Sequence, residues 1–156
     1  MRPRLGKGVI VEENVQFGEN VVIWNYVVIG SNTRIGDGTC VGSFCDIGKD
    51  VVIGRNSNVQ AHVTISNGCK IGDDVFIAPN SSFLNDKYPK SGVLTPVIVK
   101  DNAVLGGGVT ILPGVRVEEG SVVGGAVLNT NNFRLSSVVP ALNIYLIINK
   151  YVVPYR

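Results

Sequence analysis

The chain has 156 residues, of which 45% are hydrophobic and 17% charged, and this length is typical of one domain. Its net charge of +2 is spread over scattered lysines and arginines, which argues against nucleic acid as a partner. No apolar run approaches the ~20 residues of a membrane-spanning helix, and the start is not a secretory signal, so we expect a cytoplasmic protein with no membrane partner.

An aliphatic or aromatic residue recurs at every sixth position from Leu5 to Phe83. From Val9 on, a second small or β-branched residue lies two positions before each of these residues, and such alternation is typical of a short strand. The next three residues are turn-like, and the third is almost always Asn, Asp or Gly, which tolerate positive φ. The recurring positions are Leu5, Val11, Phe17, Ile23, Ile29, Ile35, Val41, Ile47, Ile53, Val59, Ile65, Ile71, Ile77 and Phe83.

Short strands and tight turns repeated in sixes resemble the hexapeptide-repeat proteins. The resemblance covers about Leu5 to Leu128 and implies an all-β, single-domain, left-handed parallel β-helix, in which three hexads form one triangular coil. Equivalent residues of successive coils would then stack ~4.8 Å apart. We expect these aliphatic ladders to be the main favourable contribution to folding, at ~1.5–3 kcal/mol per inward side chain as an upper estimate.

The register breaks once, over residues 84–96 (LNDKYPKSGVLTP), where we predict a loop. The repeat restarts at Val99, sixteen residues after Phe83 instead of a multiple of six. A long excursion from a regular scaffold commonly carries function. We therefore expect a β-helix with an inserted loop over residues 1–129, followed by a C-terminal tail or cap over residues 130–156.

One column of turns carries bulky side chains where the other columns carry Asn, Asp or Gly. It contains Trp24, Tyr26, Phe44, His62 and Asn80. Positive φ is unfavourable for aromatic residues, so a compensating contact is needed, either a ligand wall or the subunit interface that we favour. His62 is either a general base, as in several hexapeptide acyltransferases, or one rung of this stack.

Metal chemistry and thiol chemistry are both disfavoured. The γ-type carbonic anhydrases share this fold but bind zinc through three histidines, and this chain has one histidine, so we expect no metal. Three cysteines without CxxC spacing also argue against a disulfide framework. Cys45 and Cys69 fall on inward positions and Cys40 on an outward one, and none is expected to be a nucleophile.

The loop and the coils after it look like the sugar-nucleotide N-acetyltransferases of this superfamily. The similar stretches are IGDDVFIAPNSSFLNDKYP (71–89) and VIVKDNAVLGGGVTILPGV (97–115). The matching residues are Phe83, Asn85, Tyr88, Pro89 and Lys100, whereas Lys90 replaces the usual arginine. The resemblance implies acetyl-CoA as cosubstrate and, as acceptor, the amino group of a nucleotide-linked amino sugar.

The resemblance also implies where the acceptor binds. It places Asn85 beside the acceptor amine, which the amide oxygen can bind as an acceptor, and Asp86 is the alternative base. Both are also ordinary turn residues. Lys87, Tyr88 and Lys90 supply cations and a ring for a nucleotide diphosphate, and they are the candidate substrate-binding residues.

For coenzyme A, the family places the pantetheine arm in the groove between neighbouring helices, against turn backbone. The candidates are Gly106, Gly107 and Gly124, where glycine allows close approach, and Lys100 and Arg134 for the phosphates. Glycine in a turn and solvated surface charge are the alternative explanations. The family builds its sites between subunits, so we expect a homotrimer.

A function in a different class stays open. The family usually closes with a VVxGNPA-like segment, and here only Val138, Val139, Pro140 and Ala141 match it, without the Gly-Asn pair. The fold also serves in proteins that do no chemistry. The alternative is therefore a non-catalytic β-helix scaffold or assembly subunit.

Overall fold

The computed structural model describes residues 2–88, 92–126, 128–129 and 138–139. In this part of the chain all regular structure consists of two-residue strands in three parallel sheets, here called A, B and C. It contains no helix of the length and apolar character needed to cross a bilayer.

Each sheet takes every third strand of the chain. Sheet A contains β1 (Arg4–Leu5), β4 (Val22–Ile23), β7 (Cys40–Val41), β10 (Asn58–Val59), β13 (Phe76–Ile77), β16 (Val104–Leu105), β19 (Val122–Val123) and β21 (Val138–Val139). Sheet B contains β2 (Ile10–Val11), β5 (Val28–Ile29), β8 (Asp46–Ile47), β11 (Thr64–Ile65), β14 (Ser82–Phe83), β17 (Thr110–Ile111) and β20 (Leu128–Asn129). Sheet C contains β3 (Gln16–Phe17), β6 (Arg34–Ile35), β9 (Val52–Ile53), β12 (Lys70–Ile71), β15 (Ile98–Val99) and β18 (Arg116–Val117).

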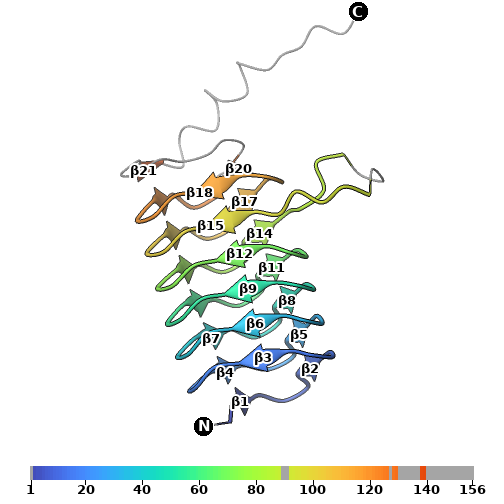
Figure 1. The fold of residues 1–156 in the computed structure, drawn as a ribbon. Coiled ribbons are helices and arrows are strands. Elements are labelled where there is room, and N and C mark those ends of the chain that lie inside the picture. The colour runs from blue at the N-terminus through green and yellow to red at the C-terminus, as the bar shows by residue number, and fades with distance from the viewer. Residues whose placement is uncertain (1, 89–91, 127, 130–137, 140–156) are drawn as a thin grey trace, which may run out of the picture.

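The chain rises as a left-handed coil. Figure 1 shows it passing from sheet B on the right, through sheet C at the front, to sheet A on the left while it climbs away from the N-terminus. Inward residues of successive coils pair directly, for example Leu5 with Ile23. Across the inserted loop Phe83 pairs with Ile111, so the register resumes in phase. The predicted all-β parallel β-helix built from hexapeptide repeats is confirmed.

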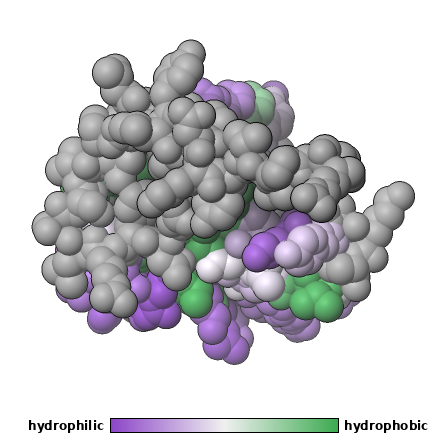
Figure 2. All heavy atoms as spheres, turned by 90° about the horizontal axis from the view of Figure 1, so that it is seen from above, coloured by the Kyte–Doolittle hydropathy of each residue, from purple (hydrophilic) through white to green (hydrophobic). Residues whose placement is uncertain are grey.

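The core is the set of ladders predicted from the sixfold spacing. From Ile23 to Val123 the recurring apolar positions are buried, and Phe83 is the largest of them, with no exposed surface. The ladders are open at the N-terminal end, where Leu5 is 46% exposed. Outward side chains on the walls are mixed, and Figure 2, which looks along the helix axis, shows hydrophilic and hydrophobic side chains side by side on the visible rim.

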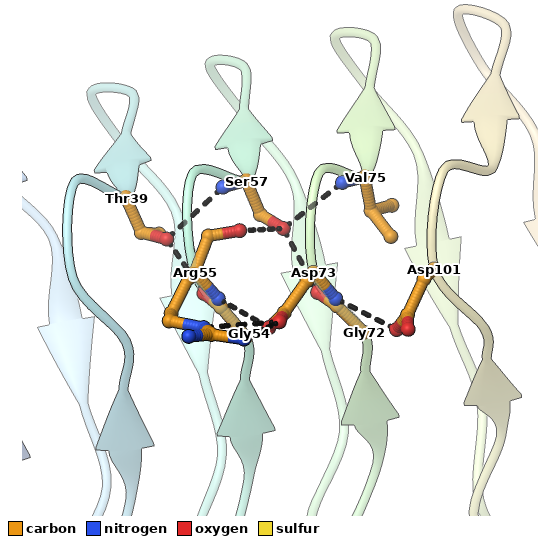
Figure 3. A network of polar contacts seen from close by, with 8 residues as sticks. All are labelled: Thr39, Gly54, Arg55, Ser57, Gly72, Asp73, Val75 and Asp101. Atoms are coloured by element: carbon orange, nitrogen blue, oxygen red, sulfur yellow. Dashed lines mark hydrogen bonds and ion pairs between the residues drawn. The ribbon is translucent and has the colours of Figure 1, made fainter.

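Inward hydroxyl groups link one coil to the next. The Thr39 hydroxyl donates to the Gly54 carbonyl at 2.6 Å and accepts the Ser57 N–H at 3.1 Å. The Ser57 hydroxyl repeats this pattern one coil higher with Gly72 and Val75 (Figure 3). Both polar atoms are buried, and these bonds satisfy them within the apolar core.

Carboxylates link the turns between sheets C and A. Asp73 accepts from the backbone N–H of Arg55 at 2.7 Å and forms an ion pair with its guanidinium, also at 2.7 Å (Figure 3). The hydrogen bonds from Arg55 lower the pKa of Asp73. Asp101 in turn accepts the N–H of Asp73 at 2.9 Å, so each turn fixes the turn below it.

The cysteines occupy the predicted positions. Cys45 and Cys69 are buried inward residues, and Cys40 is half-buried. Burial raises the pKa of the Cys45 thiol and of the Cys69 thiol to about 11. Both thiols therefore stay protonated at neutral pH and pack in the core as small apolar side chains.

Candidate functional site

The sheets meet at three corners, which we name by the sheets that they join. Each corner contains one residue per coil at positive φ, except the B–C corner of the coil that carries the inserted loop. The A–B corner contains Gly8, Tyr26, Phe44, His62, Asn80, Gly108 and Ala126, and the B–C corner contains Asn14, Asn32, Asp50, Gly68 and Gly114. His62 and Asn85 lie at different corners, because Asn85 follows β14 in the inserted loop at the B–C corner. Sheet B separates them.

The loop replaces the positive-φ residue of its coil with a proline. Pro96 precedes the inward residue Val97, which is the position of Gly68 in the coil below. Its ring lies over Gly68, where an added Cβ would come within 2.9 Å of the Pro96 Cγ. Proline holds φ near −65° and has no N–H, so this coil lacks the corner donor that the others have.

The side chain of Asn85 supplies the missing donor. In the coils below, the Asp50 N–H donates to the Ser31 carbonyl and the Gly68 N–H to the Lys49 carbonyl. The next acceptor in this series is the Asn67 carbonyl, and it accepts from Asn85 Nδ2 at 3.0 Å. The amide is thereby oriented, with Nδ2 on the corner and Oδ1 available as an acceptor.

Two backbone hydrogen bonds close the neck of the loop. The Thr95 N–H donates to the Asn85 carbonyl at 2.7 Å, and the Thr95 carbonyl accepts from the Gly114 N–H at 2.7 Å. Thr95 therefore takes the corner position that Asn67 holds one coil below. The excursion from Asn85 to Thr95 begins and ends at one point of the scaffold.

A surface pocket of about 200 Å³ lies beside this neck. Polar side chains from β8, β11, the turn after β11 and the loop line it, namely Asp46, Thr64, Ser66, Asn67 and Asn85. Asn67 holds both walls in place, because its side-chain oxygen accepts the Lys49 N–H at 2.9 Å while its carbonyl accepts from Asn85. The pocket therefore combines a carboxylate, two hydroxyls and two fixed amides.

The sequence reasoning missed Asp46, Thr64, Ser66 and Asn67. Asp46 and Thr64 occupy outward strand positions, for which the sixfold repeat predicts solvent-facing side chains. Their spacing in the sequence does not set them apart from the other outward residues. One signal was available: Asp is depleted in strands. Of the 12 acidic residues in the sequence, all within the described part of the chain, Asp46 is the only one on a strand.

His62 belongs to an aromatic stack on the outer surface of the A–B corner. Its ring lies 5.0 Å from that of Phe44 with an interplanar angle of 10°, and Phe44 stacks on Tyr26 at 5.3 Å. Among the described residues no hydrogen bond to the imidazole orients it as a base. The geometry supports the interpretation of His62 as a rung of the stack.

The remaining loop candidates lie outside the pocket lining. The Asp86 carboxylate accepts the Tyr88 N–H at 3.0 Å, which is a local turn interaction. The Lys87 ammonium lies 5.6 Å from the centre of the Tyr88 ring, and Tyr88 is 68% exposed. Lys90 lies outside the described residues.

The glycine candidates for coenzyme A differ from one another. A Cβ at Gly106 would collide with the backbone of Gly125 in the next coil, so packing alone explains Gly106. A Cβ at Gly107 would meet only the Pro79 carbonyl at 3.5 Å, an ordinary contact, and its φ is not positive. Gly107 thus leaves open backbone on the outer surface of the A–B corner, two coils above His62.

The other cosubstrate candidates are not brought together with Gly107. Gly124 lies one coil higher at the same corner, whereas Lys100 follows β15 at the corner between sheets C and A. Arg134 lies outside the described residues. In the described part of the chain no group of three or more His, Cys, Asp or Glu side chains is placed to hold a metal ion.

Comparison with known proteins supports the fold. Residues 32–67 match the family model described as bacterial transferase hexapeptide (six repeats). A search of curated proteins found no match. Residues 32–67 therefore carry the hexapeptide repeat that this model describes.

Solved structures share this architecture at low sequence identity. A variant of AntD, an N-acyltransferase from Bacillus cereus in complex with dTDP and coenzyme A, has a TM-score of 0.55 and 17% identity, covering 88% of this chain and 90% of that chain. A variant of perosamine N-acetyltransferase from Caulobacter crescentus, in complex with CoA and GDP-perosamine, has a TM-score of 0.51 and 16% identity, covering 83% and 50%. WeeI from Acinetobacter baumannii AYE has a TM-score of 0.50 and 19% identity, covering 81% and 52%. This chain spans about half the length of the last two proteins.

Proposed function

We propose that this hexapeptide-repeat protein is a cytoplasmic acetyl-CoA-dependent N-acetyltransferase acting on the amino group of a nucleotide-linked amino sugar. The observation that carries the proposal is the fixed amide of Asn85, whose Nδ2 is committed to the Asn67 carbonyl while the residue lines a polar pocket beside the inserted loop. AntD and perosamine N-acetyltransferase, which have this fold, bind coenzyme A together with a nucleotide or nucleotide sugar.

The reaction requires positioning more than a strong base. A neutral amine attacks the thioester carbonyl, an N–C bond forms, the C–S bond breaks, and the coenzyme A thiol leaves with the proton that the nitrogen loses. Amine pKa values lie close enough to neutrality that an oriented acceptor such as Asn85 Oδ1 can hold the attacking nitrogen without full general-base catalysis. Asp86 and His62 are the other candidates for a base.

The acceptor is tested by thiol release from acetyl-CoA. We expect a higher kcat/KM with dTDP- or UDP-linked 3-amino sugars than with free glucosamine or serine, because Lys87, Tyr88 and Lys90 would bind the nucleotide diphosphate. Equal activity with free glucosamine would contradict the nucleotide requirement. No thiol release with any of these acceptors would reject the enzyme in favour of a non-catalytic scaffold.

Gly107 provides a test of the acetyl-CoA site. Replacing Gly107 with leucine is expected to raise the KM for acetyl-CoA about tenfold, because the side chain would cover backbone that the pantetheine arm approaches. The melting temperature should stay unchanged, since a Cβ fits there. Ser43→Leu, at the same turn position lower on the A–B corner, is the control. An unchanged KM in Gly107→Leu would move the cosubstrate away from this corner.

We also propose that the chain forms a homotrimer through the aromatic corner. Phe44 is 53% exposed, Tyr26 46% and Trp24 45%, a concentration of apolar surface that monomers rarely leave in water. Light scattering at micromolar protein should give a mass three times the 16.6 kDa of the chain, and Phe44→Glu should reduce it. A wild-type mass of one chain would contradict this arrangement.

A further inference from the structure

The Asp46 carboxylate is in an unusual environment for this fold. Asp is unfavourable in strands, and the other 11 acidic residues of this chain lie in turns or in the loop. The cross-strand neighbours of Asp46 on sheet B are Val28 and Thr64, neither of which is a cation. Within the described residues no hydrogen bond or ion pair involves its carboxylate. Nothing in the fold requires a charge at this position.

Sheet B differs from the other sheets in its outward residues. From β8 upward, Asp46, Thr64, Ser82 and Thr110 stand in register, each beside the next. At the same levels the outward residues of sheet A are Asn58, Phe76, Val104 and Val122, and those of sheet C are Val52, Lys70, Ile98 and Arg116, so both of these rows are interrupted by apolar side chains. A continuous row of small polar side chains, beginning with a carboxylate, therefore runs along the wall between the loop corner and the corner of Gly107.

The pocket concentrates these groups at one place. Asp46 lies on one side and Asn85 on another, with Thr64, Ser66 and Asn67 between them. Its volume of about 200 Å³ is below the ~300–1,000 Å³ of sites for drug-sized ligands, so it suits one small polar group such as a sugar ring. A carboxylate with hydroxyls and amide oxygens matches a ring that carries an ammonium and hydroxyl groups.

We propose that this pocket binds the amino-bearing ring of the acceptor, with Asp46 forming a charge-assisted hydrogen bond to its amino group and Asn85 Oδ1 accepting a second one. This assignment rests on the proposed function and deepens it. Asp46 is then the residue that selects an amine over a hydroxyl, because a carboxylate binds the ammonium form of the acceptor more strongly than it binds a neutral hydroxyl group. The ammonium form gives up one proton to solvent before the neutral amine attacks, and the carboxylate then accepts a hydrogen bond from the remaining N–H. The nucleotide would extend from the pocket towards Lys87 and Tyr88.

The first test is Asp46→Asn, which keeps the size of the side chain and removes its charge. We expect the KM for a dTDP-linked 3-amino sugar to rise about tenfold to a hundredfold, the loss of one charge-assisted hydrogen bond, with an unchanged KM for acetyl-CoA. Asp74→Asn makes the same chemical change at an exposed turn of another corner and should match the wild type. Wild-type kinetics in an active Asp46→Asn protein would overturn the assignment and leave the proposed function intact.

A binding measurement separates the pocket from the activity. In NMR titrations of the full chain, D-glucosamine is expected to shift the side-chain amide signals of Asn85 and Asn67. D-glucose should shift them much less. In Asp46→Asn, glucosamine should not shift them at all. This result in a protein that releases no thiol would support the pocket and reject the transferase. Equal shifts with both sugars, or shifts that persist in Asp46→Asn, would overturn the proposal.

Discussion

Replacing Asn85 with alanine is expected to lower kcat for acyl transfer by about 10²-fold or more, because the oriented oxygen that holds the attacking nitrogen is lost. His62→Ala should change kcat far less, since the imidazole stacks on Phe44 at a different corner. Stopped-flow or steady-state thiol release with a nucleotide-linked amino sugar measures both. A large loss of kcat in Asn85→Ala with a small loss in His62→Ala would mean that the Asn85 oxygen positions the acceptor and that His62 is part of the surface stack.

The two functions of the Asn85 amide can be separated by a second variant. Asn85→Asp keeps a side-chain oxygen but cannot donate to the Asn67 carbonyl, so it should lose the orientation of the side chain and part of the loop anchoring. We expect an activity between those of the wild type and Asn85→Ala. If His62→Ala abolished turnover while the protein still assembled and bound acetyl-CoA, His62 would have to be assigned as the base.

Phe83→Ala is expected to have the largest effect on stability, lowering the free energy of unfolding by about 3–5 kcal/mol. Phe83 has no exposed surface and stacks between Ile65 and Ile111, so its removal leaves a cavity in the ladder directly below the loop. Urea denaturation followed by circular dichroism measures the difference.

Phe76 supplies the matched control for this substitution. It lies on the outward side of the preceding strand and is 37% exposed, so Phe76→Ala should change the free energy of unfolding by no more than about 1 kcal/mol. Similar losses in the two variants would mean that the inward ladder does not dominate the stability of the coils. Preserved stability in Phe83→Ala would contradict the register itself.

The scaffold could be predicted from the sequence because its rule is local and repeats. The inward residues and the positive-φ residue of each hexad can be identified from that hexad alone. The structure places Tyr26, Phe44 and His62 at positive φ, where the register predicts a left-handed turn. The loop could be bounded for the same reason, since Val99 restores the spacing after Phe83. These features need no knowledge of what lies on neighbouring coils.

The candidate site was predictable only in part, because it depends on what the coils bring side by side. The resemblance pointed to Asn85, but its donor role follows from Pro96, eleven positions later, taking a corner position without an N–H. An Asp at a strand position was the one sequence signal for Asp46, and its place in the site became clear only once β8 was known to lie beside the turn that anchors Asn85. Strand β21 also escaped prediction, since its pairing with β19 does not follow the sixfold spacing.

The closed neck of the loop has an evolutionary consequence. Because Asn85 and Thr95 meet at a single rung, the segment between them can lengthen, shorten or change its chemistry without altering the pitch of the coils above. Selection can then act on recognition and on architecture almost independently. Proteins that share this neck could acquire new acceptors through substitutions, insertions or deletions between Asn85 and Thr95, while the β-helix itself stays unchanged.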